Sequence, residues 1–151
     1  MPLQLQAEAT FALLLAAFLS LVIGLERELH DQPAGLRTHM LVGVGACLFT
    51  LLSEHAFEGD DTSRVASNIV VGIGFLGAGT IIQRGGQPHH LTTAASIWAT
   101  AAVGMAVGSG AWFLGLSGSV LIWVILKIIR RFTKGTARIE ADPQQDDGVG
   151  Q

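Results

Sequence analysis

Three carboxylates lie close together in one short polar segment of the sequence, and they are the first candidates for chemistry. Glu26, Glu28 and Asp31 directly follow a long apolar run. Carboxylate oxygens are the ligands that a hard cation such as Mg²⁺ prefers. The same side chains also occur as solvated or paired surface charges, which need no metal. The segment therefore predicts a candidate cation site, with ordinary surface charges as the alternative.

Charged and polar side chains continue on both sides of this segment. Arg27 follows Glu26 directly, and Arg37 and Thr38 precede the next apolar run. The opposite charges of Glu26 and Arg37 could clamp the end of one helix to the start of the next. We expect these charged helix ends, rather than the apolar runs, to carry the function.

The remaining residues give no indication of enzymatic activity. The five histidines are scattered, and no nucleophile motif, phosphate-binding loop or metal-ligand spacing occurs in the sequence. The single cysteine, Cys47, lies within an apolar run and is expected to be a small core residue. We therefore expect a protein that is not an enzyme, has no cofactor and has no nucleic-acid partner.

Two groups of polar residues accompany the later apolar runs. Asn68 lies four residues after Arg64. An amide within a membrane-spanning helix needs a hydrogen-bonding partner, so Asn68 marks the interior of a helix bundle. Thr92, Thr93 and Ser96 cluster at the start of another run, where their hydroxyl groups could cap the helix.

Glycines are dense in the third apolar run, at Gly72, Gly74, Gly77 and Gly79. Each glycine costs a helix about 1 kcal/mol relative to alanine. One interpretation is close backbone approach between neighbouring helices. The other is a broken or kinked helix whose exposed carbonyl groups line a site.

Small residues also recur at every fourth position in the last apolar stretch. The two series are Ser96, Thr100, Gly104, Gly108 and then Ala111, Gly115, Ser119. Such faces let helices in lipid approach closely. We predict that the two faces pack against each other as an antiparallel hairpin.

The elements that must position these residues are apolar runs separated by clusters of charge. Of the 151 residues, 50% are hydrophobic and only 14% are charged, against about a quarter charged in a soluble domain. A membrane span needs about 20 apolar residues, and the flexible 108–110 segment divides the longest run in two. Residues 1–133 are predicted to form an all-α polytopic transmembrane bundle, and the polar residues 134–151 a disordered tail. The five short spans are predicted at about residues 9–25, 38–57, 65–83, 91–107 and 111–129.

The basic residues predict the orientation of these spans. Arg64 alone lies on one side of the membrane, and the other eight basic residues lie on the opposite side. These eight are Arg27, Arg37, Arg84, Lys127, Arg130, Arg131, Lys134 and Arg138. Because positively charged loops stay in the cytoplasm, the tail is predicted to be cytoplasmic and the N-terminus to lie outside.

Several motifs occur in a fixed order along the chain. They are G-L-E-R-E (24–28), A-G-L-R-T-H (34–39), S-R-V-A (63–66), G-I-G-F-L-G-A-G (72–79) and L-T-T-A-A-S-I-W (91–98), which ends at Trp98. Together they resemble the MgtC/SapB family of bacterial membrane proteins over about residues 10–126. The resemblance implies a bacterial inner-membrane protein with about five spans, which agrees with the charge argument. In such a protein the outside N-terminus predicted from the basic residues would be periplasmic. The family is linked to growth at low magnesium, to survival of pathogens in macrophages and to restraint of the rotary ATP synthase.

The chain departs from the virulence-type members of that family. It ends in a short polar tail where they carry a soluble domain, and Thr92 and Ala99 stand where they often have Asn and Cys. The resemblance therefore implies a short, SapB-like member with a housekeeping or unknown role rather than a virulence role.

Two functions remain open. One is a regulator in magnesium or membrane-energy homeostasis that acts through helix contacts. The other is a transporter or ion-conducting oligomer with a site at the glycine-rich third span, which would need a dimer or larger assembly. The expected partners are the lipid bilayer, further copies of the chain in a homo-oligomer such as a dimer, and a membrane protein, which the resemblance identifies as the rotary ATP synthase.

Overall fold

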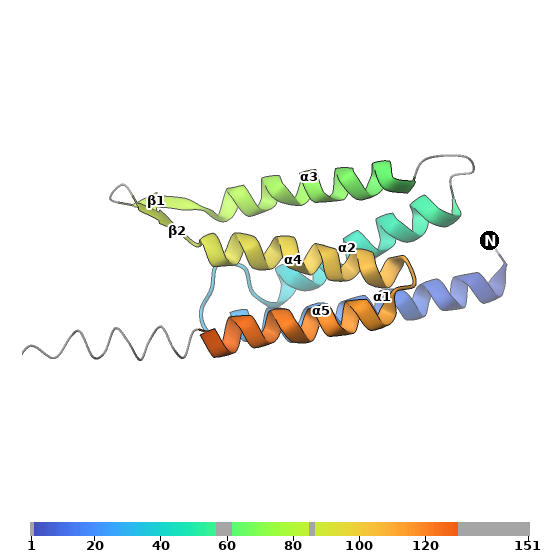
Figure 1. The fold of residues 1–151 in the computed structure, drawn as a ribbon, viewed down its shortest axis with the longest axis horizontal. Helices are drawn as coiled ribbons and strands as arrows, with labels where there is room; N and C mark the ends of the chain where they lie inside the picture. The colour runs from blue at the N-terminus through green and yellow to red at the C-terminus, as the bar shows by residue number, and fades with distance from the viewer. Residues whose placement is uncertain (1, 57–61, 85–86, 130–151) are drawn as a thin grey trace, which may run out of the picture.

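A computed structural model describes residues 2–56, 62–84 and 87–129 of the chain. This part of the chain forms five helices that alternate in direction along one axis (Figure 1). They are α1 (Leu3–Glu28), α2 (Leu36–His55), α3 (Thr62–Thr80), α4 (Leu91–Gly108) and α5 (Trp112–Val124). A π-helical segment, Ile125–Ile129, continues α5. The predicted all-α membrane bundle is confirmed, whereas the predicted tail at 134–151 lies outside the described residues.

A short β-hairpin joins α3 to α4 and was not predicted. Strands β1 (Ile82–Arg84) and β2 (Gln87–His89) pair antiparallel, with Ile82 opposite His89 and Arg84 opposite Gln87. The hairpin projects beyond the helices at one end of the bundle (Figure 1). We call this end, where α1 ends and α2 and α4 begin, the hairpin end.

The helix bounds differ from the predicted spans in a consistent way. The helix α1 begins at Leu3 rather than near residue 9 and continues to Glu28, because charged residues mark the edge of lipid and do not end a helix. The third helix stops at Thr80, so the predicted span 65–83 extends too far into β1. Three helices, α1, α2 and α4, are each long and apolar enough to cross a membrane, and α5 is apolar but shorter.

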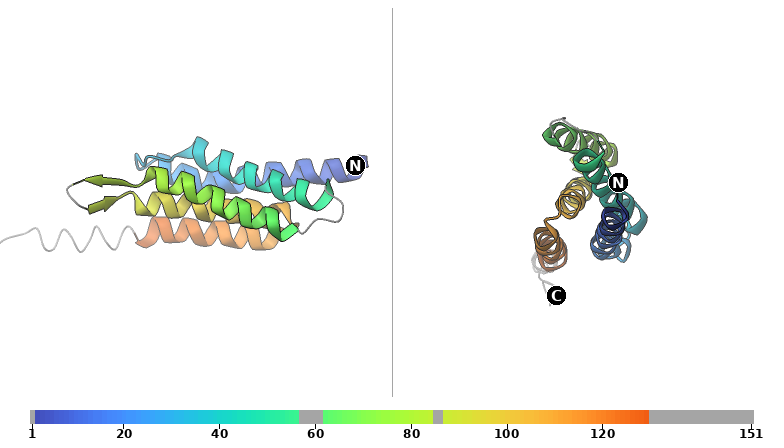
Figure 2. Two further views of the ribbon diagram at one scale, coloured as in Figure 1. Left: turned by 90° about the horizontal axis from the view of Figure 1, so that it is seen from above. Right: turned by 90° about the vertical axis from the view of Figure 1, so that its right-hand side faces the viewer.

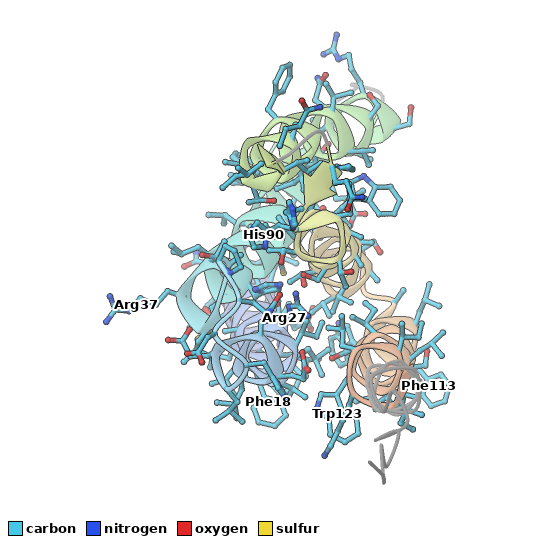
Figure 3. The ribbon with its side chains drawn as sticks, turned by 90° about the vertical axis from the view of Figure 1, so that its left-hand side faces the viewer. Phe18, Arg27, Arg37, His90, Phe113 and Trp123 are labelled. Carbon is cyan, nitrogen blue, oxygen red and sulfur yellow. The ribbon has the colours of Figure 1, made fainter. Side chains whose placement is uncertain are left out.

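The helices α2 and α4 occupy the middle of the bundle. Seen along the bundle axis, α3 lies on one side of this pair, and α1 and α5 lie on the other (Figure 2). One apolar cluster around Ile23 and Val107 joins α1, α2 and α4 and is covered by α5 and the segment that continues it, and another joins α2, α3 and α4 around Ala46 and Ile97. Outward-facing aromatic side chains such as Phe18, which is 60% exposed, suit a surface in contact with lipid (Figure 3).

The predicted turn after Gly108 is confirmed. The helix α4 ends at Gly108, and Gly110 adopts a left-handed conformation with φ of 76° before α5 begins. A residue with a Cβ would be strained there. The turn thus reverses the chain within three residues, as the 108–110 segment predicted.

The predicted pairing of the two small-residue faces is wrong. Gly104 and Gly108 of α4 face α2, where a Cβ at Gly108 would lie 2.7 Å from the Cys47 carbonyl oxygen. Gly115 of α5 does face α4, but it packs on the Val107 side chain. Ser119 instead donates a hydrogen bond to a carbonyl of α1. Spacing predicts which residues share a face but not which helix that face meets.

Candidate functional site

A buried ion pair lies in the last turn of α1, at the hairpin end. The Glu26 and Arg27 side chains are each 3% exposed, and Arg27 Nη1 lies 3.6 Å from Glu26 Oε2. These residues continue the face of α1 that buries Leu19 and Ile23, because positions three and four apart share one side of a helix. His30 Nδ1 lies 3.2 Å from Glu26 Oε1. Both charges therefore point into the protein, where each needs a partner.

Arg27 also joins α1 to α4. Its Nη2 donates hydrogen bonds to Thr93 Oγ1 at 3.0 Å and to Gln32 Oε1 at 2.8 Å. Thr93 lies in the first turn of α4 and is fully buried. Figure 3 shows the Arg27 side chain between the helices rather than on the outside of the bundle. Hydrogen bonds from a guanidinium are charge-assisted and stronger than neutral ones, so Arg27 ties the two helices together firmly.

His39 makes the corresponding connection between α2 and α4. Its ring is fully buried, with Nδ1 2.8 Å from the Gly35 carbonyl oxygen and Nε2 3.1 Å from Ser96 Oγ. A carbonyl oxygen only accepts, so the hydrogen-bond network assigns a proton to Nδ1. The Ser96 hydroxyl can donate either to Nε2 or to the Thr93 carbonyl oxygen, which lies 2.8 Å away. Both ring nitrogens therefore have a hydrogen-bonding partner.

Close backbone packing surrounds these side chains. A Cβ at Gly24 would lie 2.9 Å from the Leu36 Cα atom, so α1 and α2 touch there. Beside this contact, Glu28 Oε2 accepts a hydrogen bond of 2.9 Å from the Leu36 backbone N–H. A carboxylate is favourable at this position because the first N–H groups of a helix have no partner within it. Gly35 leaves the space that the Glu28 carboxylate occupies.

We call Glu26, Arg27, Gln32, His39, Thr93 and Ser96 the helix-end cluster. It extends into the bundle only as far as Thr100, whose hydroxyl donates to the Ser96 carbonyl oxygen. One turn further along α4, Gly104 meets the Gly43 backbone of α2 directly. The buried polar groups between α2 and α4 therefore give way to backbone contact about halfway along the bundle.

Four residues predicted from the sequence meet in this cluster: Glu26, Arg27, Thr93 and Ser96. The two hydroxyl residues were expected to cap α4, and this interpretation is wrong. His90 occupies the cap position, and no side chain provides a capping hydrogen bond there. Thr93 Oγ1 instead accepts a hydrogen bond from Arg27 of α1, and Ser96 Oγ is hydrogen-bonded to His39 Nε2 of α2.

Other predicted residues lie outside the cluster. Arg37 is exposed and points away from the bundle (Figure 3), while Glu26 pairs with Arg27 and His30, which corrects the expected Glu26–Arg37 clamp. Thr38 is half-buried, and Thr92 and Trp98 are exposed. Arg64 and Asn68 lie on α3 and are also exposed.

The three candidate metal ligands do not converge. Glu26 faces the interior of the bundle, Glu28 binds the start of α2, and Asp31 is exposed in the loop. Within the described residues, no three acidic, histidine or cysteine side chains are placed to share a metal ion. The structure therefore gives the predicted cation site no support.

The glycines of α3 fit neither interpretation well. The helix is continuous from Thr62 to Thr80, so it is not broken. A Cβ at Gly77 would lie 3.5 Å from the Ala94 carbonyl oxygen, so Gly77 faces α4, in line with the first interpretation. Gly72, Gly74 and Gly79, however, face open space.

Sequence reasoning missed His39 and Gln32 as members of the cluster. His39 had a usable signal, because a histidine just inside an apolar run is costly unless it has a partner. Gln32 had no signal, since a glutamine in a polar loop is ordinary.

Similarity to known proteins extends over most of the bundle. The model of the MgtC family matches residues 13–134. The chain is 44% identical over 135 residues to a protein of Escherichia coli K12 named "Putative magnesium transporter YhiD", covering 84% of this chain and 63% of that protein. It is 41% identical over 140 residues to protein SrpB of Synechococcus elongatus, covering 83% of this chain and 76% of SrpB.

A further relative is protein MgtC of Salmonella typhimurium. The two chains are 42% identical over 110 residues, which covers 73% of this chain and 47% of that protein. The chain therefore spans less than two thirds of the E. coli and Salmonella proteins. No solved structure matches the chain.

Proposed function

The chain belongs to the MgtC family of membrane proteins, and on this premise we propose that it is a non-enzymatic regulator acting through contacts with another membrane protein. Its setting is magnesium and membrane-energy homeostasis, as the family resemblance implies. By the same resemblance its partner is the rotary ATP synthase. The E. coli relative carries magnesium in its name, but that name describes a longer protein.

This proposal rests on how far the buried polar groups extend along the bundle. The helix-end cluster occupies one end of the bundle, and beyond Thr100 the helices α2 and α4 touch backbone to backbone at Gly43 and Gly104. An ion that crosses a membrane needs polar groups or water along its path. The backbone contact at Gly43 and Gly104 leaves no space for such a path between the two central helices at this level, which favours a regulator over a transporter.

Exposed residues at the hairpin end supply a surface for a partner. Arg37 points away from the bundle beside the buried cluster (Figure 3). The cluster fixes the relative positions of α1, α2 and α4, so Arg37 is presented from a rigid base. A partner bearing an acidic group would bind here.

A transporter is the second candidate function. It is favoured by the name of the E. coli relative and by the exposed Asn68 beside the glycines of α3. Because the centre of one protomer is closed at Gly104, such a path would have to run along α3 in an assembly.

We further propose that the protein spans the bacterial inner membrane five times, with its N-terminus in the periplasm and its tail in the cytoplasm. The alternating direction of the five helices and the distribution of basic residues support this orientation. Reporter fusions after Glu58 and after Lys134 should report opposite sides of the membrane. Fusions that report the same side would contradict the five-span orientation.

Site-specific photocrosslinking in cells tests the regulatory proposal. A photoreactive amino acid at position 37 should form a crosslink to a subunit of the membrane ATP synthase. The same amino acid at position 113, where Phe113 is 83% exposed on α5, is the matched control and should reach only lipid. Crosslinks to lipid alone at both positions would contradict a partner at the hairpin end.

A further inference from the structure

An open apolar groove of about 450 Å³ runs between α2 and α3. Leu41, Gly45 and Phe49 line it on α2, and Asn68, Gly72 and Leu76 line it on α3. In each helix these residues are four apart, so they form one continuous stripe along the wall. The helix α3, which forms one wall of the groove, lies on the opposite side of the central helix pair from α1 and α5 (Figure 2).

Asn68 is out of place in a single protomer. Its side chain was expected to face the interior of the bundle, but it is exposed, and it makes no hydrogen bond within the described part of the chain. It lies about 9 Å along α3 from the start of that helix, given the rise of 1.5 Å per residue. At that depth a side-chain amide meets hydrocarbon, where an unsatisfied polar group is costly.

The chemistry of the groove selects its occupant. An acyl chain could fill the apolar walls but could not bond to the amide of Asn68. An amide carries both donors and an acceptor, so an identical amide complements it fully. The residues that line the groove are uncharged, so the groove itself brings no like charges together. Gly45 and Gly72 have open space above them, which would let an incoming helix approach the backbone closely.

We propose that a second copy of the chain docks in this groove about a two-fold axis, with Asn68 hydrogen-bonded to the partner's Asn68. The two-fold axis follows because a surface that binds its own copy is self-complementary. The pairing also fixes the register of the two α3 helices, as single buried asparagines do in coiled coils. This interface is independent of the regulatory function proposed above.

Two glycines of α3 provide a matched test. Gly72 lines the groove and Gly74 does not, yet both face open space in the protomer, so leucine fits at either position without a clash. Full-length protein carrying donor and acceptor dyes would be diluted with lipid in vesicles, and energy transfer would report association. Wild type and Gly74→Leu should associate equally, whereas Gly72→Leu should weaken association at least tenfold. Asn68→Leu should weaken it about tenfold, as expected for loss of an interhelical amide pair.

Disulfide crosslinking gives a second readout that does not depend on affinity. In a background in which Cys47 is replaced by alanine, Asn68→Cys should form a dimer on mild oxidation, because two side chains on a two-fold axis are within bonding distance. Gly74→Cys is the control and should not crosslink. A protein that stays monomeric at every dilution would overturn the proposal and leave the groove to lipid. Association that Gly74→Leu weakens and Gly72→Leu does not would also overturn it.

Discussion

Arg27→Met tests the structural role of the helix-end cluster most sharply. The substitution keeps the length and the apolar stem of the side chain but removes its charge and its donors. It deletes the hydrogen bonds to Thr93 and Gln32 and the ion pair with Glu26. The Glu26 carboxylate, which is 3% exposed, then loses its pairing with the Arg27 guanidinium, while His30 Nδ1 lies 3.2 Å from Glu26 Oε1.

The size of the effect follows from burial. Removing one member of a buried ion pair costs about 3–5 kcal/mol, because the remaining charge is left poorly compensated. We therefore expect Arg27→Met to lower the free energy of unfolding by about 3–5 kcal/mol. Arg37→Met is the matched control, and it should change this free energy by less than about 0.5 kcal/mol because Arg37 is exposed.

The assay is equilibrium unfolding in mixed micelles with rising SDS, followed by the fluorescence of the three tryptophans. The double variant Glu26→Gln, Arg27→Met removes both charges and should recover at least half of the loss. Equal stability of Arg27→Met and Arg37→Met would refute the reasoning. So would a double variant less stable than Arg27→Met.

Two other predictions concern backbone contacts and the start of α2. Gly104→Leu should lower the free energy of unfolding by about 1–3 kcal/mol, because the leucine side chain would meet the Gly43 carbonyl. Gly79→Leu is the control and should have little effect in the same assay, because Gly79 faces open space. Equal effects of the two variants would contradict the α2–α4 contact. Glu28→Ala should speed amide hydrogen exchange at Leu36, because the carboxylate accepts that hydrogen bond. Unchanged exchange at this amide would contradict that role.

The general architecture could be predicted from the sequence. Long apolar runs and clustered charges predicted a helical membrane bundle, and the glycines at 108–110 predicted the turn between α4 and α5. The hairpin at 82–89 was missed because its strands are short, although the dipeptide Gly85-Gly86 between the triplets I-Q-R and Q-P-H is a hairpin signal.

Partners of individual side chains were harder to predict. The polar character of Glu26 and Arg27 was plain, but burial on the inner face of α1 depends on how α2 and α4 close around the helix end. For the same reason the sequence predicted Arg37 as a partner for Glu26, whereas in the structure Arg37 points outward (Figure 3). Periodicity predicts a face, and only the packed bundle decides which residues meet across it.

The central claim is that one protomer is a regulator with no path for ions through the centre of its bundle. Magnesium flux into liposomes that contain the purified protein and a Mg²⁺-sensitive dye tests it directly. We predict the same uptake as in protein-free liposomes, under any imposed gradient. Uptake above that level, lost in a folded Asn68→Ala variant, would contradict the claim and identify a transporter.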